Sequence, residues 1–459
     1  MRRSVPLILL PRFAGCGAPA PTAPGAVPDG IVGEWSGTIE VPGSPLDLGL
    51  TLTPDGGSLA VPAQGQGGIP VEDIVLDGDL LTFAVPALPG GARFAGTRSG
   101  ERIAGTWTQG GHDLPLVLER GGLAGPARPQ EPRPPFPYRA EDVTFDGDRI
   151  TVAGTLTLPE GDGPFPAVVL ITGSGAQDRD QTIAGHRMFL VLADALTRAG
   201  YAVLRTDDRG VGGTGGVLAD ADYRVLAADV VARTRFLRGR PEIDGDRIGL
   251  LGHSEGGYLA PLAADAAGAA FAILMAGAAV GGQEVLELQN RLLLEAAGAA
   301  DQVEDQVAFV RRYGALVRAG DVDGARALAR ERVSEQQAGL PEEQRGDVEQ
   351  LVAGIGPTPY FRSFLRHDPG PSLRALDVPV FAFFGDKDLQ VPSAQSEPVM
   401  RELLAGNPAA TVRTFPELNH LMQPAETGAV HEYPLIGTTI APEVLDAVTA
   451  WLREHVPAP

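Results

Sequence analysis

Residues 248–265, Ile-Gly-Leu-Leu-Gly-His-Ser-Glu-Gly-Gly-Tyr-Leu-Ala-Pro-Leu-Ala-Ala-Asp, decide the fold. The apolar run that ends at Leu251 predicts a buried strand, and Tyr258–Asp265 predicts a helix. Between them lies Gly252-His-Ser-Glu-Gly-Gly257, whose glycines permit a sharp turn with closely packed backbones. We expect a strand-to-helix turn that exposes the Ser254 hydroxyl above the sheet. The alternative is a glycine-rich turn in which the serine is incidental.

From residue 140 to residue 459, apolar runs alternate with amphipathic stretches. Short, almost wholly apolar runs are typical of parallel strands buried on both faces. They occur at residues 167–172, 201–205, 247–251 and 271–275, and the strand pattern resumes at 378–384 and 411–415. Segments with apolar residues at helical spacing occur at 189–199, 223–237 and 442–455. With an opening hairpin at 141–145 and 150–158, this alternation predicts an α/β fold with a mostly parallel sheet.

Residues 281–370 interrupt this alternation. They are charged, show no strand pattern and carry apolar residues at helical spacing, such as Val285, Leu288 and Leu292. Because the segment falls between two predicted strands, we expect a helical cap that is inserted into the α/β domain and stands over one end of the sheet.

The region before the α/β domain has a different pattern. Residues 30–120 consist of short alternating runs separated by turn sequences such as Asp55-Gly-Gly57 and Asp77-Gly-Asp79. This pattern predicts a small all-β domain, either a barrel or a sandwich. Residues 121–139 contain six prolines, which are typical of a stiff linker and indicate a domain boundary.

The first residues have the pattern of a secretory signal. Two arginines after Met1 precede a short apolar run and then the small residues that lead to Cys16. Residues 1–16 resemble a bacterial lipoprotein signal, in which the cysteine is lipidated. The alternatives are an ordinary cleaved signal and a buried free cysteine. Residues 17–29, rich in proline and alanine, predict a tether. We therefore expect an exported protein, either lipid-anchored in the cell envelope or periplasmic or secreted.

Composition excludes several classes of function. The 459 residues carry 58 acidic and 37 basic side chains, for a net charge of −21, which argues against electrostatic binding of nucleic acid. A single cysteine excludes an internal disulfide framework and a zinc site built from several cysteines. We expect no metal site, and membrane contact only through an N-terminal lipid.

A serine becomes a strong nucleophile only when a base takes its proton and an acid orients that base. In this fold the acid follows the serine along the chain and the histidine comes last. His420 directly follows the last predicted strand and is the favoured base, with His431 as the alternative. At the end of the preceding strand, Asp386 and Asp388 are two residues apart, so only one is expected to face the imidazole. The apolar residues that follow favour Asp388.

Backbone N–H groups must stabilise the oxyanion that forms when the serine attacks a carbonyl. The residue after the serine, Glu255, supplies one, and we expect its side chain to turn away. The loop after the first parallel strand, Thr172-Gly-Ser-Gly175, supplies the other, for which we choose Ser174. Three aromatic residues at the exit of the cap are candidates for the substrate pocket, although core packing explains them equally well. They are Tyr360, Phe361 and Phe364.

Five motifs in this order resemble the α/β-hydrolase superfamily, in particular the exported bacterial branch related to serine aminopeptidases, monoacylglycerol lipases and dienelactone-hydrolase-like esterases. They are Gly173-Ser-Gly-Ala-Gln-Asp-Arg-Asp180, Asp207-Asp-Arg-Gly-Val-Gly212, Gly252-His-Ser-Glu-Gly-Gly257, Gly385-Asp-Lys-Asp-Leu-Gln-Val391 and Leu418-Asn-His-Leu-Met422. The β-rich region resembles the accessory domain of some exported members. The resemblance implies a cofactor-independent hydrolase with the triad Ser254, Asp388 and His420.

Two positions depart from the pattern of this family. Thr172 stands where a histidine commonly precedes the oxyanion glycine, and Thr214 stands where the second motif usually ends in serine. We expect the aspartates and arginines of the first two motifs to pair with one another and brace loops.

Three hypotheses for the function follow. The first is a carboxylesterase that cleaves small-molecule esters through an acyl-enzyme. The second is a serine aminopeptidase or amide hydrolase, in which cap carboxylates bind the substrate's ammonium group. Those carboxylates, which a solvated helix face would also explain, are Glu284, Glu287, Asp301, Glu304 and Asp305. The third is a cell-surface binding protein with a vestigial hydrolase domain.

Overall fold

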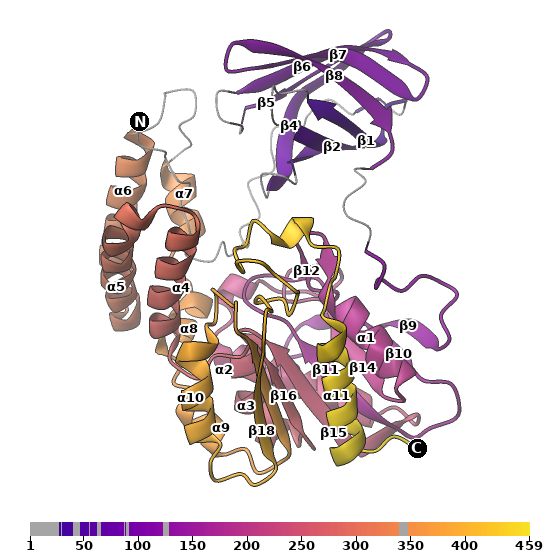
Figure 1. Cartoon of the computed structure of the whole chain (residues 1–459), viewed down its shortest axis with the longest axis vertical. Helices are drawn as coiled ribbons and strands as arrows, with labels where there is room; N and C mark the ends of the chain where they lie inside the picture. The colour runs from indigo at the N-terminus through magenta and orange to yellow at the C-terminus, as the bar shows by residue number, and fades with distance from the viewer. Residues whose placement is uncertain are drawn as a thin grey trace.

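The computed structural model describes most of the chain from residue 27 onward (Figure 1). The described ranges are 27–28, 30–39, 46–54, 56–61, 66–86, 88, 91–122, 128–338 and 348–459. The predicted signal sequence, Cys16 and nearly all of the predicted tether lie outside them.

The N-terminal domain is a closed barrel of eight antiparallel strands, in which β1 pairs with both β2 and β8. The strands are β1 Gly33–Ile39, β2 Leu46–Thr53, β3 Gly56–Val61, β4 Gln66–Asp77, β5 Leu80–Val85, β6 Ala92–Ser99, β7 Arg102–Gln109 and β8 His112–Arg120. Trp35, Phe94 and Trp107 fill its interior and are almost completely buried. The predicted β-rich domain is confirmed, and of the two predicted architectures it is the barrel.

The second domain is built on one eight-stranded sheet in the order β18-β17-β16-β15-β11-β14-β10-β9. Its strands are β9 Arg139–Asp146, β10 Thr151–Leu158, β11 Phe165–Ile171, β14 Ala202–Thr206, β15 Ile243–His253, β16 Ala272–Met275, β17 Val380–Gly385 and β18 Ala410–Phe415. Pairings from β14 through β18 are parallel, whereas β10 is antiparallel to both of its neighbours. The predicted α/β fold with its opening hairpin is confirmed.

Helices cover both faces of this sheet. The buried residues of α1 and α11 form one apolar core with the sheet, and those of α2, α3 and α10 form the other. The helices are α1 Met188–Arg198, α2 Tyr223–Arg238, α3 Gly256–Ala267, α9 Gly370–Arg374, α10 Ser393–Leu403 and α11 Pro442–His455. Short elements in the loops are β12 Thr182–Ile183, β13 His186–Arg187, and the 3₁₀ turns η2 Leu218–Asp220 and η5 Tyr433–Leu435.

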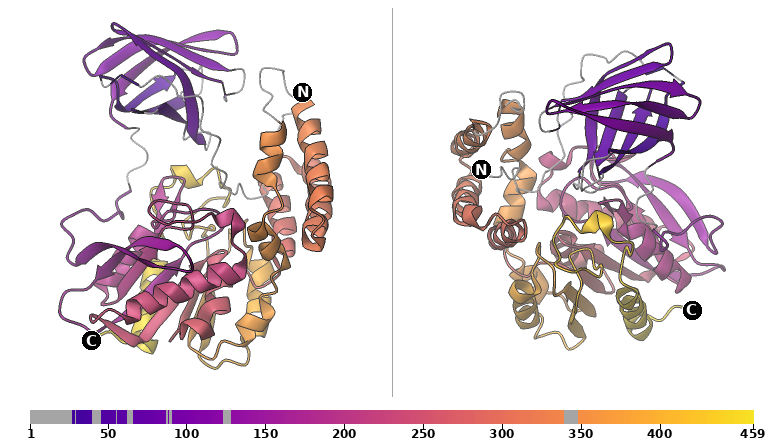
Figure 2. Two further views of the ribbon diagram at one scale, coloured as in Figure 1. Left: turned by 180° about the vertical axis from the view of Figure 1, so that it is seen from behind. Right: turned by 45° about the horizontal axis from the view of Figure 1, so that its top comes forward.

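A helical insertion follows β16 and precedes β17. Its helices are α4 Gly282–Ala296, η3 Ala300–Gln302, α5 Val303–Ala319, α6 Val322–Ala338, α7 Val348–Ile355 and α8 Pro359–Arg366. Figures 1 and 2 show α4–α7 as a bundle beside the sheet, and α8 leading back to it. The predicted helical cap is therefore present.

The proline-rich stretch contacts the α/β domain where the structure describes it. The side-chain amide of Gln130 donates to the carbonyl of Ile440 (2.6 Å) and accepts from the N–H of Thr439 (2.6 Å). Arg128 donates to the carbonyl of Pro434 (3.0 Å). Residues from Arg128 onward are thus fixed on the loop that precedes α11.

Two kinds of feature are missing from the described ranges. None of the helices there has the length and apolar character needed to cross a membrane. Nor do His, Cys, Asp and Glu side chains gather there, three or more together, in a way that could hold a metal ion.

Candidate active site

Ser254 lies in the turn between β15 and α3, in a left-handed backbone conformation with φ of +55°. Its N–H donates to the carbonyl of Met275 (2.9 Å). Glycines make this turn sterically allowed: a Cβ on Gly252 would lie 2.0 Å from the carbonyl oxygen of Gly256, and one on Gly256 would lie 2.3 Å from that of Ile171. The serine is therefore held in a strained conformation of the kind that functional sites carry.

Ser254 lines a partly open pocket. Its lining residues come from the turn between β15 and α3 (the elbow), the loop after β11, the cap and the loop after β17. They are Ser174, Ser254, Glu255, Tyr258, Ala278, Val285, Leu286, Gln289, Phe364, Gln390 and Val391. A mostly apolar pocket with a few polar groups is the usual form of a small-molecule site.

His420 and Asp388 are hydrogen-bonded to each other. Imidazole Nδ1 lies 2.7 Å from Asp388 Oδ2, and both side chains are almost fully buried. The other carboxylate oxygen, Oδ1, accepts the backbone N–H groups of Gln390 (2.7 Å) and Val391 (2.8 Å). Three donors thus fix the carboxylate, which in turn orients the ring.

The two alternatives considered from the sequence lie elsewhere. Asp386 is exposed, and its carboxylate accepts the backbone N–H of Glu417 (2.6 Å). His431 is exposed and lies two residues before the short turn η5. Neither side chain takes part in the contact between His420 and Asp388.

Within the described part of the chain, the Ser254 hydroxyl makes no hydrogen bond, either to His420 or to another group. The residue before Ser254, His253, nevertheless contacts the loop that carries His420. The ring of His253 lies 4.8 Å from that of His420, centroid to centroid, and its Nε2 lies 3.0 Å from the His420 carbonyl oxygen. Catalytic hydrogen bonds are often long without substrate and tighten when it binds.

The hydrogen-bond partners of His253 determine which of its ring nitrogens carries the hydrogen. Its Nδ1 lies 2.6 Å from the side-chain nitrogen of Gln181, which can only donate, so Nδ1 accepts. Nε2 then carries the hydrogen and donates to the carbonyl of His420. Burial, followed by the neighbouring His420, lowers the pKa of His253 to about 3, so the ring stays neutral. Gln181 Oε1 in turn accepts the N–H of Gly173 (3.1 Å), which links the loop after β11 to both histidines.

The loop after β11 has a single free amide among three. Gly173 N–H is taken by Gln181, and Gly175 N–H donates to the hydroxyl of Tyr360 (3.0 Å). In the ranges that the structure describes, the N–H groups of Ser174 and Glu255 donate to no other group of the chain. These two are the amides that the sequence analysis chose as oxyanion donors, and their role stays a prediction.

The Glu255 side chain points to two tyrosines. The hydroxyl of Tyr223 donates to Oε1 (2.5 Å), and that of Tyr360 donates to Oε2. Burial, with a smaller contribution from the charge of Asp208, raises the pKa of this carboxyl to about 7. The carboxylate is thus engaged by the tyrosines, in keeping with the expectation that it turns away.

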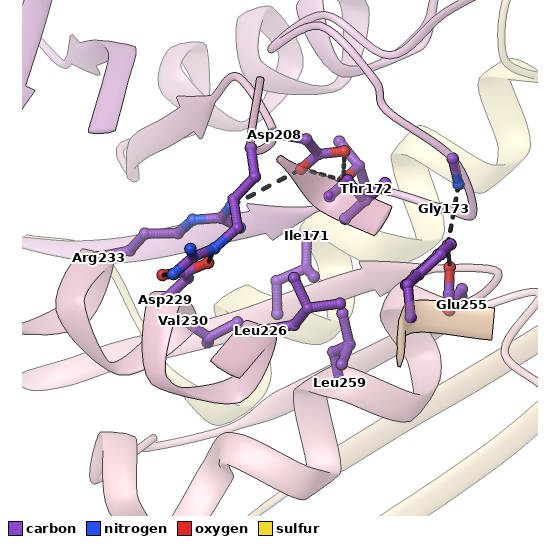
Figure 3. A pocket seen from close by; sticks show the side chains of 14 residues that line it. Ile171, Thr172, Gly173, Asp208, Leu226, Asp229, Val230, Arg233, Glu255 and Leu259 are labelled. Atoms are coloured by element: carbon purple, nitrogen blue, oxygen red, sulfur yellow. Dashed lines mark hydrogen bonds and ion pairs between the residues drawn. The ribbon is translucent and has the colours of Figure 1, made fainter. Parts of the chain in front are cut away.

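A second pocket, which holds the buried polar groups Thr172, Asp208 and Arg233, lies behind this loop (Figure 3). The hydroxyl of Thr172 donates to the carboxylate of Asp208 (2.8 Å), and the guanidinium of Arg233 lies 3.8 Å from it. Burial raises the pKa of Asp208 to about 6. Thr172, at the position where the family commonly has histidine, thereby anchors the start of the loop.

The three aromatic candidates have different surroundings. Phe364 lines the pocket that holds Ser254. Tyr360 lines the second pocket, and Phe361 is buried in the apolar core between Tyr313 and Phe364.

The expected pairing between the first two motifs is present for Arg179, which contacts Asp207 (2.7 Å). Arg209 pairs instead with Asp229 on α2, outside both motifs (2.6 Å). Sequence reasoning did not single out Gln181 or Tyr223, because neither belongs to a motif whose spacing indicates a role.

Comparison with known proteins identifies the family of the chain. A model of the alpha/beta hydrolase family matches residues 168–432, more than half of the chain. Esterase EstD of Thermotoga maritima is 27% identical over 318 residues, which cover 69% of this chain and 68% of EstD. Among solved structures, the alpha/beta hydrolase GrgF of Penicillium sp. sh18 is 18% identical with a TM-score of 0.43, covering 69% of this chain and 99% of GrgF. An esterase of Pyrococcus furiosus is 17% identical with a TM-score of 0.41, covering 69% and 92%. The chain belongs to the alpha/beta hydrolase family.

Proposed function

We propose that the protein is a carboxylesterase that cleaves small-molecule esters through an acyl-enzyme. Ser254 Oγ attacks the ester carbonyl carbon while His420 Nε2 accepts its proton, and Asp388 holds the imidazole in the required tautomer. The N–H groups of Ser174 and Glu255 stabilise the oxyanion. The protonated imidazole then gives its proton to the leaving alkoxide, and an activated water releases the acid by the same route.

The observation that carries this proposal is the set of groups around one pocket. Ser254 lies there in a strained turn, and Ser174 and Glu255, whose N–H groups donate to no other described group, line the same pocket. The hydrogen-bonded, buried pair of His420 and Asp388 lies on the loops after β18 and β17. Membership of the alpha/beta hydrolase family and the similarity to EstD, which is named an esterase, support the same reaction.

The pocket favours an uncharged substrate. Ala278, Val285, Leu286 and Phe364 supply apolar walls. The pocket's carboxylate, that of Glu255, is engaged by two tyrosines. An apolar acyl group fits these walls better than an ammonium group, which requires an accessible anion.

The cap carboxylates considered for an aminopeptidase give that hypothesis little support. Glu287, Glu304 and Asp305 form ion pairs with Arg311, Arg291 and Arg332, respectively. None of the five lines the pocket that contains Ser254. We therefore retain the peptidase as the outcome to be excluded by experiment.

A substrate panel on the purified protein tests the proposal. We expect hydrolysis of p-nitrophenyl acetate and butyrate, no hydrolysis of aminoacyl p-nitroanilides, and covalent labelling by a fluorophosphonate that Ser254→Ala abolishes. Hydrolysis of the anilides alone would make the protein a peptidase. A wild-type protein that neither reacts with the fluorophosphonate nor cleaves any ester would instead support a binding protein with a vestigial site.

We also propose that this activity resides in the cell envelope. The proposal rests on the sequence of residues 1–16, and metabolic labelling of the native host with an alkyne fatty acid tests it. We expect label on the wild-type protein and none on Cys16→Ser. Unlabelled wild-type protein would show that Cys16 carries no lipid.

A further inference from the structure

A single buried phenol connects the cap to both sides of the proposed oxyanion hole. Tyr360 lies on α8, at the end of the cap, and is 1% exposed. Its hydroxyl oxygen accepts the N–H of Gly175 (3.0 Å), and its hydrogen is donated to Glu255 Oε2. The first partner is next to Ser174, and the second directly follows Ser254.

This phenol fixes one end of the loop whose middle amide is free. At the other end, Gln181 accepts the N–H of Gly173 (3.1 Å). Gly175 has a φ of +89°, a conformation that a non-glycine residue adopts only with strain. Buried side chains hold the amides on both sides of Ser174, and these two hydrogen bonds, here called the clamps, set the direction of the Ser174 N–H.

Helix α8 is itself firmly placed. Its first turn is capped by Thr358, whose hydroxyl accepts the N–H of Phe361 (3.1 Å). The hydroxyl of Ser363 accepts the N–H of Tyr223 at the start of α2 (3.1 Å). The cap can therefore transmit its position to Gly175 through a fixed helix.

We propose that Tyr360 is a positioning residue that sets the direction of the Ser174 N–H, so that docking of the cap through α8 completes the oxyanion hole. The inference rests on the proposed esterase function. It assigns to Tyr360 a role in the rate of the chemical step, as distinct from a contact with substrate.

Glu255 is the acceptor that keeps this phenol in place, and its ionisation state matters. An ionised carboxylate accepts from both tyrosines and leaves the Tyr360 oxygen free to accept from Gly175. A protonated carboxyl must itself donate, and if Tyr360 accepts that hydrogen, the Gly175 N–H loses its partner. Because the pKa of Glu255 is about 7, the clamp is complete above that pH and weakens below it.

The titratable and charged groups around Glu255 come from every element packed against it. They are Tyr223, Asp229 and Arg233 on α2, Tyr258 on α3, Tyr360 on α8, Asp208 and Arg209 after β14, and His367 after α8. Burial lowers the pKa of His367 to about 4, so it stays neutral in the range of interest. Asp208, with a pKa of about 6, ionises just below Glu255.

The test compares two tyrosines that share one carboxylate. Tyr360→Phe removes the acceptor of the Gly175 N–H, whereas the matched control Tyr223→Phe removes a hydrogen bond to the same Glu255 and makes no contact with Gly175. At pH 8.5 with p-nitrophenyl butyrate, we expect kcat of Y360F to fall about 10- to 100-fold with KM within about twofold, because a direct oxyanion donor is worth about 10²- to 10³-fold. Y223F should lose less than about threefold.

Hydrogen exchange of a peptide spanning residues 172–177 gives a readout independent of turnover. We expect faster exchange at Gly175 in Y360F than in the wild type and in Y223F. Equal losses of kcat in Y360F and Y223F, or unchanged exchange, would overturn the proposal. If Y360F does not fold, Glu255→Ala replaces it, because it removes the acceptor that keeps the Tyr360 hydroxyl in place. Exchange at Gly175 as slow as in the wild type would then overturn the proposal.

These results are distinguishable from failure of the esterase function. A wild-type protein that lacks both turnover and Ser254 labelling removes the function and this inference together. Wild-type turnover with Y360F indistinguishable from Y223F removes the inference alone.

Discussion

Replacing Asp388 by asparagine should reverse the tautomer of His420. In the native site, Oδ1 accepts the backbone N–H groups of Gln390 and Val391, at 2.7 and 2.8 Å, and Oδ2 accepts the imidazole Nδ1–H at 2.7 Å. The two backbone N–H groups can only donate, so an asparagine places its side-chain oxygen toward them and its NH₂ toward the imidazole ring. Nδ1 must then accept, and the proton moves to Nε2, the atom that has to receive the serine proton.

The size of the effect follows from this reversal. The substitution preserves the shape of the site and removes the base in its active form, a change that costs serine hydrolases about 10⁴-fold in kcat. That factor corresponds to roughly 5.4 kcal/mol in activation free energy. KM should change little, because the pocket that holds Ser254 is not lined by Asp388.

Steady-state hydrolysis of p-nitrophenyl butyrate between pH 6 and 9 measures this loss, and the rate of fluorophosphonate labelling measures it independently. Asp386→Asn is the matched control, because that carboxylate lies on the same loop and is exposed. It should keep kcat within about twofold, as surface substitutions usually do. A D388N protein that retains more than a tenth of wild-type kcat, or a D386N protein that loses as much, would refute the assignment of the acid.

Three further substitutions test the elbow and its carboxylate. Ser254→Gly should abolish turnover yet stabilise the fold by about 1 kcal/mol relative to Ser254→Ala in urea unfolding, because glycine adopts a φ of +55° without strain; equal stability of the two would argue against a strained elbow. Gly252→Ala should cost about 3 kcal/mol or more, because its Cβ would lie 2.0 Å from the carbonyl oxygen of Gly256, whereas Gly406→Ala meets no atom within 4 Å and should be neutral. The pKa of Glu255 is raised from 4.5 to about 7, so the folded chain keeps a proton that the unfolded chain has lost, and stability falls as pH rises through this window. The wild type should therefore lose on the order of 3 kcal/mol more unfolding free energy than Glu255→Gln between pH 4.5 and 8, as measured by chemical unfolding. Equal pH dependence of the unfolding free energy in the two proteins would contradict the raised pKa.

The parallel sheet could be predicted because its strands carry their own signal. Strand β17, predicted at 378–384, spans Val380–Gly385 and is buried throughout. Strand β3, Gly56–Val61, carries no clear signal of its own, because it begins with two glycines and only Leu59 and Val61 of its six residues are buried. The two-residue strands β12 and β13 are too short to show any periodicity.

The candidate site could be predicted where chain order determines position. The carboxyl ends of parallel strands meet at one edge of the sheet, so residues that directly follow β15, β17 and β18 come together whatever their separation in sequence. Ser254, Asp388 and His420 are such residues. By contrast, Gln181 meets a partner 72 positions away and Tyr360 one 105 positions away, and neither lies in a motif that specifies the contact.

The backbone amides of the loop after β11 depend on both chain order and contacts that no motif specifies. An N–H group without a partner costs about 1–3 kcal/mol when buried, so a chain normally supplies an acceptor. Here the side chain of Gln181, eight residues further along the chain, accepts from Gly173, and that of the distant Tyr360 accepts from Gly175, whereas neither accepts from Ser174 between them. Ser174 itself is half-buried and lines the same pocket as Ser254, and among the described residues its N–H has no acceptor. We propose that a substrate oxyanion supplies the missing acceptor, in keeping with the role proposed above for the Ser174 N–H.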